Sequence, residues 1–264
     1  MRQWFKDLDG LLRGDSTRLG TLKDGRIGVA AGGMCVVAVI LGLVYGVCMG
    51  FFALFREGGP VWEQFLATTL KVPLLFLLTL VVTFPSLYVF NALAGSRLTI
   101  VSVLRLLLAA LAVNLAVLSS LGPISAFFAA STTSYSFMVL LNVAIFGVAG
   151  GFGLLFLLRT LHRLVVSSNE PLPEAKPLAP DSGGTPPLIV TNESAIDPMR
   201  GRLMGRHETL VFRCWVVVFA LVGSQMAWVL RPFLGNPAVE FSWFRGRGSS
   251  FFESVGQHLV NFFK

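Results

Sequence analysis

Several stretches of this chain contain no charged residue over more than the roughly 20 residues that a helix needs to cross a bilayer. The first of them is 27–55. Because backbone N–H and C=O groups must be paired with each other in lipid, such runs cross a membrane as helices. Only 13% of the residues are charged, against roughly 25% in a soluble domain. The sequence therefore predicts an all-α membrane protein.

The apolar runs, and the turn residues between them, predict five transmembrane helices. We expect these helices at about 27–55, 71–94, 98–121, 135–161 and 210–230. In the second span, Pro73 lies where a helix start tolerates proline, whereas Pro85 should kink the helix. The uncharged segment 122–136, rich in turn and hydroxyl residues, is predicted to link the third span to the fourth.

Both ends of the chain are predicted to form amphipathic helices in the headgroup region. In 1–25, apolar residues such as Trp4 and Leu8 recur at helical spacing, opposite a charged face. The alternative for this segment is a short helix packed on a soluble part of the same protein. In the tail, Ser250 followed by Glu253 indicates a capping box before an apolar stripe.

Five spans place the two termini on opposite sides of the membrane. Of the 21 Lys and Arg residues, 15 then lie on the side of the N-terminus and 6 on the other side. Because cytoplasmic segments carry the excess of basic residues, we expect the N-terminus to be cytoplasmic and the C-terminus extracytoplasmic. Arg231, followed by the helix-stopping Pro232, is then an interfacial anchor at the outer end of the fifth span.

These expectations divide the chain into five regions. They are a cytoplasmic amphipathic helix at 1–25, a four-helix transmembrane part at 26–166, a cytoplasmic Pro-rich linker at 167–200, a basic entry with the fifth transmembrane helix at 201–232, and an extracytoplasmic tail with an interfacial helix at 233–264. The linker combines proline with Ser, Gly and acidic residues, which favours an extended or disordered segment.

Residue types that carry membrane chemistry are sparse in this sequence. There is no Asp or Glu between Glu63 and Glu170, and the predicted spans contain no acidic residue. Proton pumps and ion-coupled transporters normally use such groups. We find no paired carboxylates, metal-ligand spacing, nucleophile elbow or phosphate loop. The sequence therefore predicts a protein that is not an enzyme and has no cofactor. The net charge of +7 is explained by the topology rather than by nucleic-acid binding.

Arg105 is the one charged residue that the sequence places within the membrane, since it lies about 12 Å along the helix from Arg97. It is either an anchor that snorkels to the cytoplasmic interface, with Asn91 as a potential partner, or a cationic group in a cavity that favours anions or lipid headgroups. Three other uncharged polar residues are expected to form hydrogen bonds between helices, worth about 1 kcal/mol each. They are Asn114, Asn142 and Gln225.

Glycines recur at four-residue spacing in two of the predicted spans. They are Gly42, Gly46 and Gly50 in the first span and Gly147 and Gly151 in the fourth. This spacing clears one face of a helix, so that another backbone can approach closely. We expect packing within the chain, although contact with another subunit gives the same pattern.

Two stretches resemble a group of uncharacterised bacterial five-span membrane proteins. They are FPSLYVFNALAGSRL at 84–98 and, over 225–253, QMAWVLRPFLGNP followed by EFSWFRGRGSSFFE. The resemblance implies a bacterial inner membrane and brings no activity with it. The five-span plan with an internal N-terminus is also similar, in topology only, to the Yip domain of membrane-traffic proteins.

The function that the sequence favours is a non-enzymatic membrane scaffold or an accessory subunit of a membrane assembly. Its expected partners are membrane lipids and either other membrane subunits or a second copy of the chain. Two alternatives stay open. One is a channel or permease in which uncharged polar residues and Arg105 line a path, and the other is a subunit of a lipid-handling enzyme whose active site is shared with another chain.

Overall fold

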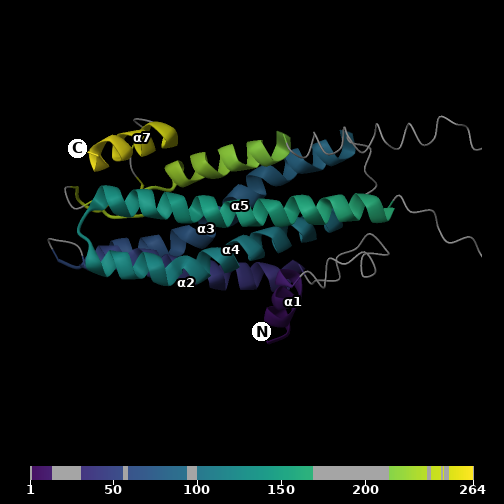
Figure 1. The fold of residues 1–264 in the computed structure, drawn as a ribbon, viewed down its shortest axis with the longest axis horizontal. Helices are drawn as coiled ribbons and strands as arrows, with labels where there is room; N and C mark the ends of the chain where they lie inside the picture. The colour runs from purple at the N-terminus through teal and green to yellow at the C-terminus, as the bar shows by residue number, and fades with distance from the viewer. Residues whose placement is uncertain are drawn as a thin grey trace, which may run out of the picture.

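The computed structural model describes residues 2–13, 31–55, 59–93, 100–168, 214–236, 239–244, 246 and 250–263. They form α1 (Arg2–Leu12), α2 (Ala31–Phe55), α3 (Trp62–Leu93), α4 (Ile100–Ser131), α5 (Tyr135–Ser168), the helix Cys214–Val229 and α7 (Phe251–Phe262), with no strand in these ranges (Figure 1). The all-α prediction is confirmed. The four helices α2 to α5 are long and apolar enough to cross a membrane, whereas the described part of the predicted fifth span is shorter.

Three of the helices, α3, α4 and α5, extend beyond the predicted spans. α3 begins at Trp62 and continues through both of its prolines, and α4 continues through Pro123 to Ser131. The prediction of a link at 122–136 was therefore wrong over most of its length. In an apolar environment, leaving several backbone groups unpaired costs more than the one hydrogen bond that a proline removes, so the helix persists. Most of the predicted linker and the basic entry, residues 169–213, lie outside the described residues.

α2 packs directly against α3 through its glycines. A Cβ atom built on Gly46 would lie 2.8 Å from the Cα of Thr69, and one on Gly42 would lie 2.9 Å from the Cβ of Pro73. A Cβ on Gly50 would lie 2.9 Å from the ring of Phe65. The four-residue glycine spacing of α2 thus allows the α3 backbone to lie against it.

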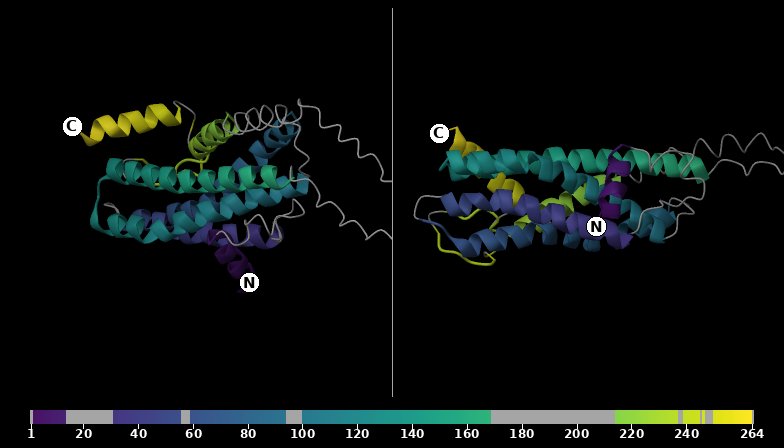
Figure 2. Two further views of the ribbon diagram at one scale, coloured as in Figure 1. Left: turned by 45° about the vertical axis from the view of Figure 1, so that its right-hand side comes forward. Right: turned by 90° about the horizontal axis from the view of Figure 1, so that it is seen from below.

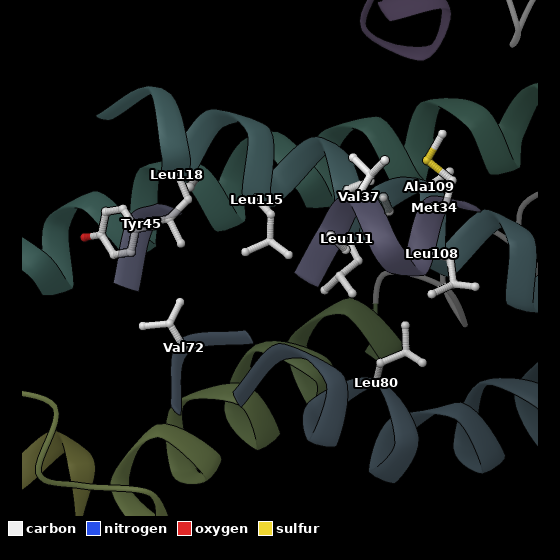
Figure 3. Packing of buried hydrophobic residues seen from close by; sticks show 14 of the residues in the cluster. Met34, Val37, Tyr45, Val72, Leu80, Leu108, Ala109, Leu111, Leu115 and Leu118 are labelled. Carbon is white, nitrogen blue, oxygen red and sulfur yellow. The ribbon is translucent and has the colours of Figure 1, made fainter. Parts of the chain in front are cut away.

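α4 supplies the largest share of the core, and α5 is the most exposed of the four long helices. In their most apolar windows, 67% of the α4 residues are buried, against 22% for α5. Figure 3 shows buried side chains of α4 together with those of α2 and α3. Those labelled are Leu108, Ala109, Leu111, Leu115 and Leu118 of α4, with Met34, Val37 and Tyr45 of α2 and Val72 and Leu80 of α3.

The helix Cys214–Val229 runs antiparallel to α3. Near its start, the indole Nε1 of Trp215 donates a hydrogen bond to the Oγ of Ser86 at 3.1 Å. Further along, a Cβ on Gly223 would lie 3.6 Å from the side chain of Thr79. The segment after the helix then reaches the first turns of α3. This arrangement returns the chain to the end of the bundle where α3 begins.

The short helices lie toward opposite ends of the bundle (Figure 2). α1 contacts α2 and α4, and its Leu8 and Leu11 are buried there, so the chain itself covers part of the apolar face. α7 contacts α5, and none of its own residues is buried. At its start, the Oγ of Ser250 accepts the backbone N–H of Glu253 at 3.3 Å, as the predicted cap requires.

Candidate functional site: an apolar groove along α5

A cavity of about 690 Å³ follows one face of α5. Its other walls come from α3, α4, the helix Cys214–Val229, the segment after that helix, and α7, with one residue from α2. The α5 residues that line it run from Tyr135 to Leu157, a rise of about 33 Å. The cavity, hereafter the α5 groove, is therefore about as long as the hydrocarbon core of a bilayer is thick, roughly 30 Å.

Glycines form the α5 side of the groove. Gly147, Gly150 and Gly151 line it together with Leu154, and their spacing of three and four residues places them on one face of the helix. Nothing lies within 4 Å of a Cβ built on any of these three glycines. Gly147 and Gly151 therefore do not pack against another helix in the described part of the chain, which corrects the prediction of intrachain packing.

The close approach of α4 to α5 uses a different glycine. A Cβ on Gly153 would lie 2.7 Å from the Cβ of Asn114 and 3.3 Å from the carbonyl oxygen of Ala110. Four-residue spacing shows that a helix face is clear, but the tertiary arrangement decides which neighbour fills the space. At Gly153 it is α4, whereas beside Gly147 and Gly151 it is the groove.

Two asparagines line the middle of the groove, and their side-chain oxygens differ in hydrogen bonding. The Oδ1 of Asn142 accepts hydrogen bonds from the hydroxyl groups of Tyr45 at 2.7 Å and Ser125 at 3.1 Å. Its Nδ2 donates to the carbonyl of Met138 at 2.8 Å, so this side chain joins α2, α4 and α5. The Oδ1 of Asn114 is also buried, but it has no hydrogen-bond partner among the described residues.

Two other predicted polar residues, Arg105 and Gln225, do not line the groove. Arg105 is half-buried on α4 and is not among the residues that line the cavity. Gln225 is exposed on its helix. The side chain of Asn91 lies outside the described residues. Of the polar residues predicted within the spans, the structure therefore brings only Asn114 and Asn142 to the groove.

Arg231 lies at the end of the groove that carries α7. Its guanidinium carbon is 3.6 Å from the ring centroid of Trp228, and its Nη2 donates to the carbonyl oxygen of Gly246. The indole Nε1 of Trp228 is buried without a hydrogen-bond acceptor in the described ranges. Among the described residues that line the groove, Arg231 is the only Lys, Arg, Asp or Glu.

α7 contributes His258 to the same end of the groove. The Nδ1 of its ring lies 3.2 Å from the Oγ of Ser136, and the ring packs edge-on against Tyr135. Burial lowers the pKa of His258 below its usual value, because desolvation disfavours the charged imidazolium. At neutral pH this side chain is therefore uncharged.

Lys71 lies deeper in its helix than the predicted span 71–94 places it. That span begins at Lys71, but α3 begins at Trp62, so Lys71 lies about 14 Å along the helix. Its side chain is only 2% exposed. Arg105 is therefore not the only charged residue within the long helices. The apolar run gave no sign that α3 would begin two turns earlier.

The buried ammonium of Lys71 bonds the segment that follows the helix Cys214–Val229. Its Nζ donates to the carbonyl of Pro232 at 3.3 Å and to that of Trp243, and it lies 5.1 Å from the ring centroid of Phe244. One turn earlier, Thr68 donates to the carbonyl of Phe233. These bonds from α3 fix the segment that closes one end of the groove.

Replacing Lys71 with methionine should loosen that segment. Methionine keeps most of the aliphatic bulk but donates no hydrogen bond. The Pro232 carbonyl keeps the Nε2 donor of Gln64 at 3.3 Å, whereas the Trp243 carbonyl loses the donor supplied by Lys71, and leaving a carbonyl unpaired costs about 1–3 kcal/mol. We expect faster amide hydrogen exchange in residues 232–244, with little change in α2 and α4. Hydrogen exchange measured by mass spectrometry on the purified chain checks this. Uniform exchange in all helices would show that Lys71 supports the whole bundle instead.

Among the described residues, no group of three or more His, Cys, Asp or Glu is placed to hold a metal ion. Comparison of the chain with models of protein families, with curated proteins and with solved structures finds no match.

Proposed function

We propose that this chain is a non-enzymatic membrane scaffold or accessory subunit that holds a membrane lipid in the α5 groove. The observation that carries the proposal is the groove itself, which is apolar and about 33 Å long and has one charged residue, Arg231, among its described lining residues, at the end that carries α7. A membrane lipid has the same layout, with long apolar chains and one polar end. The groove also suits a subunit of a lipid-handling enzyme whose reacting groups come from another chain.

The groove is open along the side of the bundle, which favours a lipid as its occupant. The exposed glycines Gly147 and Gly151 leave the groove open at the side of α5, where hydrocarbon chains from the bilayer can enter.

The proposed topology has five spans in a bacterial inner membrane, with the N-terminus in the cytoplasm and the C-terminus outside. Two features support it. The helix Cys214–Val229 follows α3 in the antiparallel sense, and α1 and α7 lie toward opposite ends of the bundle (Figure 2). Reporters that are active in only one compartment, fused to each end of the chain, test this topology. Activity of both reporters in the same compartment would exclude it.

Filling the groove should displace the lipid. Nothing lies within 4 Å of a Cβ on Gly150, so a phenylalanine there occupies the groove without first clashing with the backbone. We expect Gly150→Phe to lower the amount of co-purifying lipid at least about tenfold, which corresponds to about 1.4 kcal/mol of binding free energy. Native mass spectrometry of the full chain, released from mild detergent, measures the lipid and the oligomeric state together.

Gly256→Phe is the matched control for this experiment. Gly256 is on α7, has nothing within 4 Å of its Cβ and does not line the groove, so this variant should keep its lipid. A wild-type chain without lipid, or Gly150→Phe with undiminished lipid, would overturn the proposal. A lipid-free dimer that Gly150→Phe dissociates would instead identify a second copy of the chain as the occupant.

A further inference from the structure

We infer that the α5 groove selects a lipid with a net negative headgroup, which Arg231 and Trp228 bind at the end that carries α7. This inference rests on the proposed lipid-binding function and adds the class of headgroup and the end at which it lies. It is carried by three features of that end: a positioned cation, a buried donor without an acceptor, and the absence of carboxylates from the described lining.

Arg231 is held in place before any ligand arrives. Its guanidinium stacks on the Trp228 ring, with 3.6 Å from the guanidinium carbon to the ring centroid, and it bonds the carbonyl of Gly246. A planar guanidinium can donate two parallel hydrogen bonds to a phosphate, and a fixed side chain loses less entropy when it does so. The residue is thus pre-organised as an anion-binding group.

Trp228 adds a neutral donor one helical turn before Arg231. Its indole N–H can only donate, and within the described structure its buried Nε1 has no acceptor. A buried donor without an acceptor costs about 1–3 kcal/mol, which an oxygen of a bound headgroup would recover. Both residues line the groove, so a phosphate at its end lies beside both side chains.

The charge of the lining decides between headgroups. A zwitterionic headgroup brings an ammonium whose charge has the same sign as that of Arg231, and no Asp or Glu is found among the described lining residues to offset it. Glu240 and Glu253 are exposed on this part of the chain, outside the lining. Lys71, bonded to the carbonyl of Pro232 behind the groove, adds positive charge. An anionic lipid such as phosphatidylglycerol is therefore favoured over phosphatidylethanolamine.

The test is a competition between those two lipids with identical acyl chains. The full chain is stripped of lipid in mild detergent, mixed with micelles that contain equal amounts of both, and analysed by native mass spectrometry. We expect the wild-type chain to bind about tenfold more phosphatidylglycerol, equivalent to about 1.4 kcal/mol. Arg231→Gln should lose this preference while still binding phosphatidylethanolamine, and Arg231→Lys should retain most of it.

Arg159→Gln is the matched control, because Arg159 is exposed on α5 and does not line the groove. This variant should keep the wild-type preference for phosphatidylglycerol. Equal binding of the two lipids by the wild-type chain would overturn the inference and leave the proposed function standing. No binding of either lipid would overturn both. A full preference in Arg231→Gln would also overturn the assignment. If Arg231→Gln binds neither lipid, Arg231→Lys provides the test. Loss of the preference for phosphatidylglycerol in Arg231→Lys would overturn the assignment of the headgroup to Arg231.

Discussion

Gly46→Ala should destabilise the bundle, whereas Gly147→Ala should leave it as stable or make it more stable. A Cβ on Gly46 would lie 2.8 Å from both the Cα and the carbonyl oxygen of Thr69, which are backbone atoms of α3. They cannot move without displacing the helix, so we expect a loss of about 2–3 kcal/mol, in the upper range for overpacked sites. Thermal unfolding of both variants in the same detergent measures the difference.

The two glycines make a matched pair because the same methyl group is added to a long apolar helix in both. With nothing within 4 Å of its Cβ, Gly147 offers no steric resistance to alanine. In a helix interior, alanine is also about 1 kcal/mol more favourable than glycine. The two substitutions should therefore shift the melting temperature in opposite directions. Equal losses would mean that Gly147 also faces a tightly packed neighbour, such as a second copy of the chain.

These glycines show how far the sequence determines the fold. The apolar runs identified α2 to α5, because lipid leaves the backbone no alternative to helix. Helix ends were less accurate, since Pro123 and the residues around it suggest a turn that the apolar environment overrides. The glycine spacing indicated clear helix faces in both α2 and α5. Only the tertiary structure shows that α3 covers the face of α2 and that a groove lies beside Gly147 and Gly151.

The candidate site could be predicted only in parts. Arg231, Asn114 and Asn142 were identified as single residues, because a polar side chain is conspicuous in an apolar run. Their common position in one groove depends on segments far apart in the sequence, and no periodicity within one helix reports it. The predicted span 71–94 places Lys71 at the end of a helix. Its buried position depends on hydrogen bonds to backbone carbonyls of a distant segment, and residue types alone do not identify such acceptors.

Asn142→Leu should destabilise the bundle, and Asn114→Leu should not. Leucine at position 142 leaves the hydroxyl groups of Tyr45 and Ser125 buried without their acceptor, and each such donor costs about 1–3 kcal/mol. Serine can redirect its hydroxyl to a carbonyl of its own helix, so we expect a total loss of about 2–3 kcal/mol. Tyr45→Phe removes one of the two hydroxyl groups and should show a smaller loss, about 1 kcal/mol.

At Asn114 the same substitution removes an acceptor that has no hydrogen-bond partner in the described part of the chain. Leucine has a similar size and no polar atom to desolvate, so the stability should be unchanged or rise by up to about 1 kcal/mol. Melting temperatures of the three variants, measured in one detergent with wild-type chain alongside, separate the two asparagines. Equal destabilisation at both positions would mean that Asn114 is bonded in the native membrane, and a lipid in the α5 groove would then be the first partner to test. The two asparagines, which the sequence cannot distinguish, thus differ in what surrounds them: Asn142 joins three helices, and Asn114 lines the groove with a buried Oδ1 that has no hydrogen-bond partner in the described part of the chain.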